Sequence, residues 1–375
     1  MLELIQSEPK PSFDIQDPAT GETVIHNVLR HDKSQLLKAM VGLGASLDIK
    51  TKEGLTPILF SITNSHSDET IEFLAKHTRN IDLKDNEGHT ALILACRRER
   101  PRVLNVLIQH GASIDAQDNK GRTPVAIAVE LDSAELLKLL VDAGANVDIA
   151  NREGLTPLLH SVVNMKSPEV ISILIEKSKS SIDEKYDGHT AAQLLCKRGD
   201  VVNVSSLLMK GADGTVRDKH GNTMSLIAIF SGNVDMLAVV GGQSADIASG
   251  PENLPPILFL LRKEPTSANF KGWPNEAGIN LQEQLLAALL PHLRTSANVV
   301  DNTGRSAILY AASRSEVNSF RIMLNAAAKF NAAIQDNAGD NCYHLACRNG
   351  CKEIVDMMLH ASVRLGQFCN LRPNS

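Results

Sequence analysis

Apolar residues occur along the chain in short runs that come in pairs. In the second run of each pair they fall three or four residues apart, as in AELLKLLVDAGA (134–145) and KEIVDMMLHAS (352–362), which is the spacing of one helix face. The first run is about nine residues long and ends at a break, marked by glycine at Gly199, Gly232 and Gly350. The pattern predicts pairs of short helices along the whole chain.

The segments between the pairs are polar turns that combine an aspartate with a glycine. Aspartate can bond to nearby backbone and glycine tolerates positive φ, so we expect these turns to form hairpin tips. The clearest are DNEG (85–88), DNKG (118–121), DKHG (218–221), DNTG (301–304) and DNAG (336–339).

Each predicted helix pair also carries its own start and stop signals. A threonine two residues after the turn glycine is placed to cap the first helix. These threonines are Thr23, Thr56, Thr90, Thr123, Thr156, Thr190 and Thr223. Proline follows three of them, at the favoured first helical position. The second helix is expected to end at glycines such as Gly44, Gly111, Gly144 and Gly211.

The whole unit repeats, since KEGLTPILFSITN at 52–64 returns as REGLTPLLHSVVN at 152–164. Glycine recurs in the same setting at Gly21, Gly54, Gly88, Gly121, Gly154, Gly188, Gly221, Gly304 and Gly339. The steps are 33 or 34 residues up to Gly221, and Asn253 takes the place of the glycine in the next unit. Ten units therefore cover nearly the whole chain. A period of this size indicates a solenoid whose neighbouring units complete one another's core.

This hairpin, helix, turn, helix unit, with its G-x-T-P-L-x-x-x-A core and terminal G-A-x-x-D, resembles the ankyrin repeat. The resemblance covers about residues 17 to 362 and is clearest over 51–183. It implies an all-α ankyrin-repeat solenoid of stacked hairpin-helix-turn-helix units with a concave groove. Members of the family usually hold protein partners in that groove. The resemblance also implies that His26 and His344 form hydrogen bonds across neighbouring hairpins.

The repeat boundaries predict five segments. They are an N-terminal partial repeat or cap at 1–16, repeats 1 to 7 at 17–247, a degenerate repeat 8 with an insertion at 264–281 (248–300 in all), repeats 9 and 10 at 301–362, and a tail at 363–375. Glycines at 241, 242 and 250 predict weak helices and a weak joint at repeats 7 and 8. The insertion carries Trp273 and is expected to be an exposed recognition loop, or else a passive one.

Composition narrows the classes of function. Aromatic residues make up 3% of the chain and the net charge is -5, which disfavours base-stacking platforms and a general nucleic-acid surface. No run of eighteen apolar residues and no basic, apolar leader is present, so we expect no membrane insertion and a cytoplasmic or nuclear location. Six cysteines without paired short spacings suit a reducing compartment.

The sequence offers no signature of catalysis, since phosphate loops, H-E-x-x-H and G-x-S-x-G motifs are all missing. Cys96, Cys196 and Cys347 share one position, eight residues after the repeat glycine, and are expected to fill the core as small hydrophobes. Cys342, His344, Cys347 and Cys351 include the ligand types of zinc. They belong to two successive helices, however, so we expect neither a metal nor a cofactor.

The candidate binding residues are basic side chains nine and ten residues after the repeat glycine. They are Arg97, Arg98, Lys197, Arg198, Arg262, Lys263, Arg314 and Arg348, to which Trp273 is added from the insertion. Arg262, Lys263, Arg314 and Arg348 come from consecutive repeats and are expected to form a strip that binds an acidic or phosphorylated peptide. The alternative is structural, because cations at the end of a helix also complement its dipole.

The sequence thus predicts an interaction scaffold or adaptor that binds a protein or peptide and has no catalysis of its own. Two alternatives stay open. One is a regulatory or targeting segment of a larger enzyme or channel. The other is an RNA or phosphate binder built on the basic groove positions, which would show a steep salt dependence.

Overall fold

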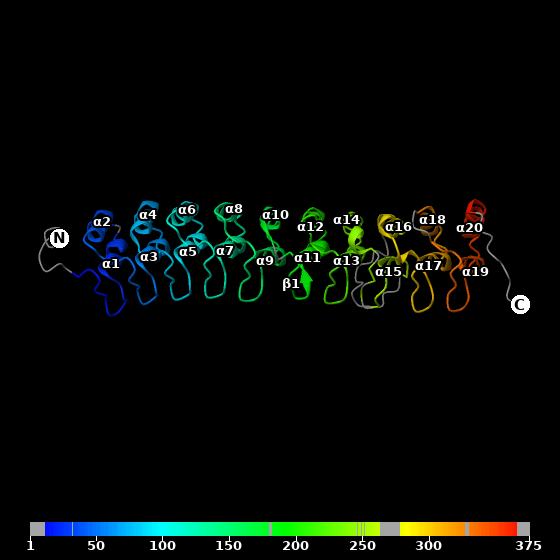
Figure 1. Cartoon of the computed structure of the whole chain (residues 1–375), viewed down its shortest axis with the longest axis horizontal. Coiled ribbons are helices and arrows are strands. Elements are labelled where there is room, and N and C mark those ends of the chain that lie inside the picture. The colour runs from blue at the N-terminus through cyan, green and yellow to red at the C-terminus, as the bar shows by residue number, and fades with distance from the viewer. Residues whose placement is uncertain are drawn as a thin grey trace. The chain divides into compact units, whose positions relative to one another are not determined.

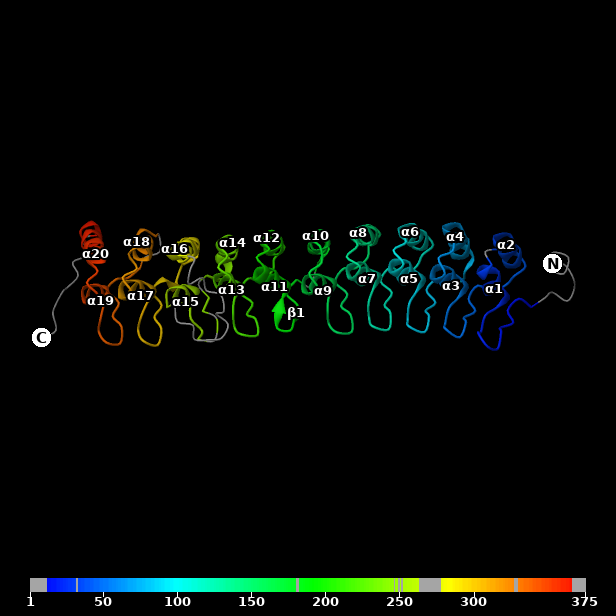
Figure 2. The ribbon, with the colours of Figure 1, turned by 180° about the vertical axis from the view of Figure 1, so that it is seen from behind.

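The computed structural model describes residues 12–31, 33–179, 182–245, 247–248, 250, 252–262, 278–326 and 330–365. The chain divides into two compact units, Met1–Ser181 (unit 1) and Ile182–Ser375 (unit 2). In each unit the odd-numbered helices form the middle layer. The hairpins project on one side of this layer, and the even-numbered helices lie on its other side (Figures 1 and 2). Lys263 and Trp273 lie outside the described residues.

Unit 1 holds repeats 1 to 5, each with two helices. These are α1 (Val24–Arg30), α2 (Ser34–Gly42), α3 (Pro57–Thr63), α4 (Asp68–His77), α5 (Ala91–Arg97), α6 (Pro101–Gln109), α7 (Pro124–Glu130), α8 (Ala134–Asp142), α9 (Pro157–Val163) and α10 (Pro168–Lys177). First helices pack on first helices of the next repeat, and second helices on second helices. The core lies between the two layers, where second-helix residues such as Leu74, Leu107 and Leu140 are fully buried.

Unit 2 holds repeats 6 to 10 in the same layered arrangement. Its helices are α11 (Ala191–Arg198), α12 (Val201–Met209), α13 (Met224–Phe230), α14 (Val234–Ser244), α15 (Pro256–Arg262), α16 (Gly278–Leu289), α17 (Ala307–Ser313), α18 (Val317–Asn325), α19 (Cys342–Arg348) and α20 (Lys352–Leu365), with two short 3-10 turns, η2 (Leu290–His292) and η3 (Ser296–Asn298). The hairpin of repeat 6 forms two short antiparallel strands, β1 (Lys185–Tyr186) and β2 (His189–Thr190), which pair Lys185 with Thr190 and Tyr186 with His189. The expected all-α ankyrin-type architecture is confirmed within each unit.

The predicted positions of the threonine caps are confirmed, because each first helix with such a threonine begins at the next residue. The hydroxyls of Thr90, Thr123, Thr156 and Thr190 accept hydrogen bonds from the backbone N–H three residues further on. The side chain thereby satisfies one of the donors that a helix leaves free in its first turn.

The break between the two helices is a single left-handed residue, eleven positions after the repeat glycine. Gly199, Gly232 and Gly350 occupy it with positive φ, as the sequence indicated. Elsewhere the same conformation is taken by a residue that carries a side chain: Ser65, Glu99, Asp132, Met165 and Ser315. A left-handed residue other than glycine costs about 1–2 kcal/mol, so these side chains are kept against a conformational penalty.

Polar side chains link the hairpins of unit 1 in a ladder. Gln16, Lys50, Lys84 and Gln117 each donate to a backbone carbonyl about one repeat further on, at Lys50, Lys84, Gln117 and Ala150 respectively. At the tips, the Asn119 amide donates to the Asn86 carbonyl at 3.0 Å. Ala150 has only a methyl group in the corresponding place and cannot donate onward.

Three expectations for repeats 5 to 8 need correction. The division of the chain falls at 181/182, between repeats 5 and 6, and not at repeats 7 and 8. Helix α14 continues through Gly241 and Gly242 to Ser244. A Cβ on Gly241 would lie 2.5 Å from the His292 ring, so this glycine permits close packing and does not end the helix. The last residues of the proposed insertion, from Gly278, belong to α16.

Candidate functional site

The residues one and nine positions after the repeat glycine meet in the structure, and we call the surface that carries them the inner face. Each pair joins the root of a hairpin to the end of the first helix of the same repeat. Hydrogen bonds or ion pairs connect Glu22 with Arg30, His89 with Arg97, Arg122 with Glu130, His189 with Lys197, and Asp340 with Arg348. The basic bias nine residues after the glycine therefore has a structural role in these repeats.

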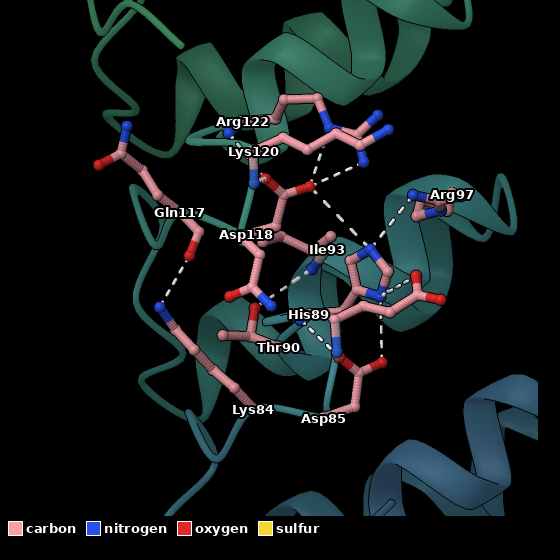
Figure 3. Close-up of polar contacts among 12 residues, drawn as sticks. Lys84, Asp85, His89, Thr90, Ile93, Arg97, Gln117, Asp118, Lys120 and Arg122 are labelled. Atoms are coloured by element: carbon pink, nitrogen blue, oxygen red, sulfur yellow. Dashed lines mark hydrogen bonds and ion pairs between the residues drawn. The ribbon is translucent and has the colours of Figure 1, made fainter. Parts of the chain in front are cut away.

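Repeat 3 shows how such a pair is built (Figure 3). The His89 side chain is only 5% exposed, and its Nδ1 lies 3.0 Å from an Asp85 carboxylate oxygen. Its Nε2 lies 3.2 Å from Arg97 Nη1. Because arginine can only donate, Nε2 accepts and the proton sits on Nδ1, which donates to Asp85. His89 is therefore a neutral link that joins the hairpin of repeat 3 to the end of α5.

Repeat 4 places an ion-pair network beside His89, and Figure 3 shows its Arg122 and Asp118 members. Arg122 Nε donates to Asp118 at 2.8 Å, and Arg122 Nη1 donates to Glu130 at 2.9 Å. Burial alone would raise the pKa of Asp118, but bonds from the Arg122 backbone and guanidinium hold it below its usual value. The Asp118 carboxylate lies 4.0 Å from His89 Nε2, so the networks of repeats 3 and 4 touch.

Repeat 6 repeats the arrangement of repeat 3 with lysine in place of arginine. His189 Nε2 lies 2.5 Å from Lys197 Nζ, and His189 Nδ1 lies 2.9 Å from the Asp187 carbonyl. Lysine can only donate, so His189 is again neutral. Burial and the nearby Lys197 charge lower the pKa of His189. Lys197 Nζ also lies 3.8 Å from the buried Asp218 carboxylate.

The described residues of the expected basic strip are already engaged within the chain. Arg262 pairs with Glu252. Arg314 donates to the carbonyls of Leu261 and Arg262 at the end of α15, and its guanidinium lies 5.6 Å from the Tyr310 ring. Arg348 holds the Asp340 carboxylate with two bonds, at 2.6 and 2.9 Å. Arg314 thus serves a helix end, as the structural alternative stated.

Other side chains, ten and eleven residues after the repeat glycine, project without such a bond. Arg98 is exposed, and among the described residues its side chain has no partner. Leu131, ten residues after the glycine of repeat 4, is 38% exposed, and Met165 in the break of repeat 5 is 76% exposed. Their turns adjoin, because Asp132 accepts from the Ser167 N–H at 2.9 Å and Lys166 donates to the Glu130 carbonyl at 2.8 Å.

The sequence prediction missed Leu131, Met165 and the pairing of positions one and nine. A signal for the pairing was present, since Glu22 with Arg30, Arg122 with Glu130, and Asp340 with Arg348 combine opposite charges at a spacing of eight. Nothing in the sequence marks Met165, because its exposure depends on the left-handed turn that carries it.

The cysteine prediction holds for two of its three members. Cys96 and Cys196 are fully buried, and burial raises the pKa of each thiol to about 12. Cys347 is exposed instead, because no further repeat covers the corresponding face of repeat 10 in the described chain. Within the described ranges no group of three or more His, Cys, Asp or Glu side chains is arranged to hold a metal.

One of the two expected histidine bridges is present. His26 Nε2 lies 3.2 Å from the Leu55 carbonyl in the next repeat. His344 differs, since it is exposed and its Nδ1 accepts from the Asn341 N–H within its own repeat.

Comparison with known proteins agrees with this geometry. The family model described as ankyrin repeats (3 copies) matches residues 25–118, 103–186 and 277–370. A putative ankyrin repeat protein of Rickettsia bellii (strain RML369-C) is 34% identical over 65 residues, which are 17% of this chain and 9% of that protein. The ankyrin repeat domain of Bcl-3, described as a unique member of the IkappaB protein family, has a TM-score of 0.52 at 24% identity, covering 59% of this chain and 99% of the domain. The chain belongs to the ankyrin repeat family.

Proposed function

We propose that the chain is a protein-interaction module that holds a segment of a partner protein on the inner face of repeats 3 to 5. Arg98, Leu131 and Met165 are the contacting side chains. Met165 carries the proposal, because it is 76% exposed and left-handed, with φ of 53°. A side chain this exposed buries little apolar surface to offset the strain, and residues in such conformations cluster at functional sites.

The surroundings of these side chains suit binding. The buried networks around His89 and Arg122 fix the hairpins against the first helices, so the surface is preorganised. Methionine adapts its shape to a partner, and arginine can form bidentate bonds with carboxylate or phosphate. The expected partner segment therefore combines apolar and acidic side chains. Arg198 remains a candidate contact in unit 2, whereas Lys197 is bonded to His189 and has the structural role.

The alternative of an RNA or phosphate binder gains less support. Its basic strip would use Arg262, Arg314 and Arg348, whose guanidinium groups are already bonded to Glu252, to backbone carbonyls and to Asp340. A regulatory segment of a larger enzyme or channel would use the same inner face, and so is compatible with the proposal. Of the described helices, none has the length and apolar character needed to cross a membrane.

Site-specific photo-crosslinking tests the proposal. A benzophenone amino acid replaces Leu131 in one sample and Met209 in another. Met209 is the control, since it is 83% exposed on α12, one of the even-numbered helices that lie opposite the hairpins. After irradiation in native lysate, a discrete protein adduct is expected at position 131 and not at 209. Equal adducts at both positions, or an adduct that ribonuclease removes, would refute the proposal.

A further inference from the structure

A polar atom of repeat 5 is buried without a hydrogen-bond partner. His160 lies in α9, six residues after the repeat glycine, and its side chain is half-buried. Its Nδ1 is buried, and no described residue bonds to it. A buried polar atom without a hydrogen bond lowers the stability of a fold, so the presence of His160 here needs another reason.

The same position is apolar or aromatic in the other repeats from repeat 2 onward. Its occupants there are Phe60, Leu94, Ile127, Leu194, Ile227, Phe259, Tyr310 and Leu345. Tyr310 alone among them has a polar group, and its hydroxyl donates to Asp301 at 2.6 Å. An apolar side chain therefore suits the scaffold at this position, and His160 departs from the pattern without benefit to the fold.

The surroundings of His160 are those of the proposed partner contacts. Burial lowers the pKa of His160, and the nearby charges of Glu130 and Lys166 act on it in opposite directions. Glu130 directly precedes Leu131 in the chain. Lys166 directly follows Met165, and its Nζ donates to the Glu130 carbonyl at 2.8 Å. His160 thus lies where the turns of Leu131 and Met165 adjoin.

His160 and Lys166 both have N–H groups left to donate. The lowered pKa keeps the His160 ring neutral at pH 7, with a single proton. Nδ1 has no acceptor beside it, so the proton belongs on Nε2, which is not enclosed in this way and can be reached by a partner. The Lys166 ammonium has three donors, of which one is used. Of the nearby anions, Glu130 is bonded to Arg122 and Glu153 is exposed to solvent, which screens its charge.

We propose that His160 and Lys166 form a subsite for a carboxylate of the partner segment. His160 Nε2–H and the Lys166 ammonium donate to the carboxylate oxygens, while Leu131 and Met165 contact the apolar side chains next to it. Hydrogen bonds to a charged group are about twice as strong as those between neutral groups. This inference rests on the proposed function, to which it adds a place for an acidic side chain between two apolar contacts.

A double-mutant cycle with peptides tests the subsite. Random twelve-residue peptides displayed on phage are selected on the full chain, and those that block the photo-adduct at position 131 are synthesised. Each Asp or Glu of a peptide is then replaced in turn with Asn or Gln. One such replacement is expected to weaken binding to the wild type about tenfold and to have little effect on binding to His160→Leu.

Two further variants make the cycle specific. His160→Gln is expected to keep most of the affinity, because its amide N–H can replace Nε2–H. His220→Leu removes an exposed histidine of unit 2 and is expected to bind the peptides as the wild type does. If His160→Gln binds no better than His160→Leu, or His220→Leu weakens binding as much as His160→Leu, the proposal is overturned.

Thermal unfolding separates this role from a structural one. His160→Leu removes the unpaired Nδ1, so its melting temperature is expected to equal or exceed that of the wild type. A melting temperature lowered by several degrees would overturn the subsite and leave the proposed function standing. The same holds if no replacement of a peptide carboxylate discriminates between wild type and His160→Leu. A library without any peptide that blocks the adduct would instead contradict the proposed function, and the subsite with it.

Discussion

Repeats 3 and 4 in unit 1 and repeats 6 and 7 in unit 2 carry equivalent polar centres with different chemistry. In both, a neutral histidine links a hairpin to a cation at the end of the first helix, and a buried aspartate follows in the next repeat. In repeat 4 Arg122 pairs with that aspartate and with Glu130. In repeat 7 Asn222 takes its place, donating to Asp218 at 3.2 Å, while its own Oδ1 has no partner in the described chain.

The difference shows two ways in which the charge of a buried aspartate at one scaffold position is balanced. Backbone N–H groups lower the pKa of both aspartates against the opposing effect of burial, so both carboxylates stay charged. In repeat 4 the Arg122 guanidinium neutralises the Asp118 carboxylate directly. In repeat 7 the Asp218 carboxylate is neutralised by Lys197 of repeat 6, from 3.8 Å. These cations hold the hairpins in place, and the proposed partner contacts are neighbouring side chains that no such bond engages.

The largest expected effect is the loss of Arg122. Arg122→Ala leaves the Asp118 carboxylate buried without its partner, which is expected to cost about 3 kcal/mol in the free energy of unfolding. Asn222→Ala removes one hydrogen bond and is expected to cost about 1 kcal/mol. Urea unfolding followed by circular dichroism measures both losses. Equal losses would mean that the two centres depend on backbone N–H groups alone.

A smaller effect concerns pH. Because the pKa of folded His189 is lowered, the unfolded chain binds more protons between that pKa and the usual value of about 6.5. The free energy of unfolding is therefore expected to fall as pH is lowered through 6.5, and to be restored above it. His189→Asn is expected to flatten this dependence in urea titrations at several pH values. A slope unchanged by the substitution would show that His189 protonates freely in the folded protein.

The smallest expected effects separate two adjacent arginines. Arg97→Leu removes an exposed bond to His89 and is expected to cost about 0.5 kcal/mol, whereas Arg98→Leu is expected to have almost no effect on stability. Partner recovery from lysate is expected to show the reverse order, with the larger loss for Arg98→Leu. If Arg97→Leu weakens recovery more, the division between structural and binding arginines is wrong.

Much of the fold could be predicted because its signals are local. Thr90 and Thr123 mark helix starts, and Gly111 and Gly144 mark helix ends, through bonds within a few residues. The reason for Gly241 could not be predicted, because it is distant in sequence: the His292 ring packs where a Cβ would lie.

The candidate site could be predicted only in part. The basic bias was visible, but sequence alone did not reveal that Arg314 reaches carbonyls some fifty residues earlier in the chain, or that Arg97 bonds to His89. Exposure was hardest to foresee. Met165 and Met209 look alike as sequence, yet one lies in a left-handed turn and the other ends a right-handed helix.

Met165→Gly tests most directly the claim that the inner face keeps a strained side chain for binding. Glycine relieves about 1–2 kcal/mol of left-handed strain and loses about 0.5–1 kcal/mol through the unfolded state, so the melting temperature is expected to rise by about 2 °C. Partner recovery by the same sample is expected to fall. Met209→Gly is the matched control, and it is expected to lower the melting temperature and leave recovery unchanged. If Met165→Gly lowers the melting temperature, or raises it without loss of the partner, the claim is contradicted.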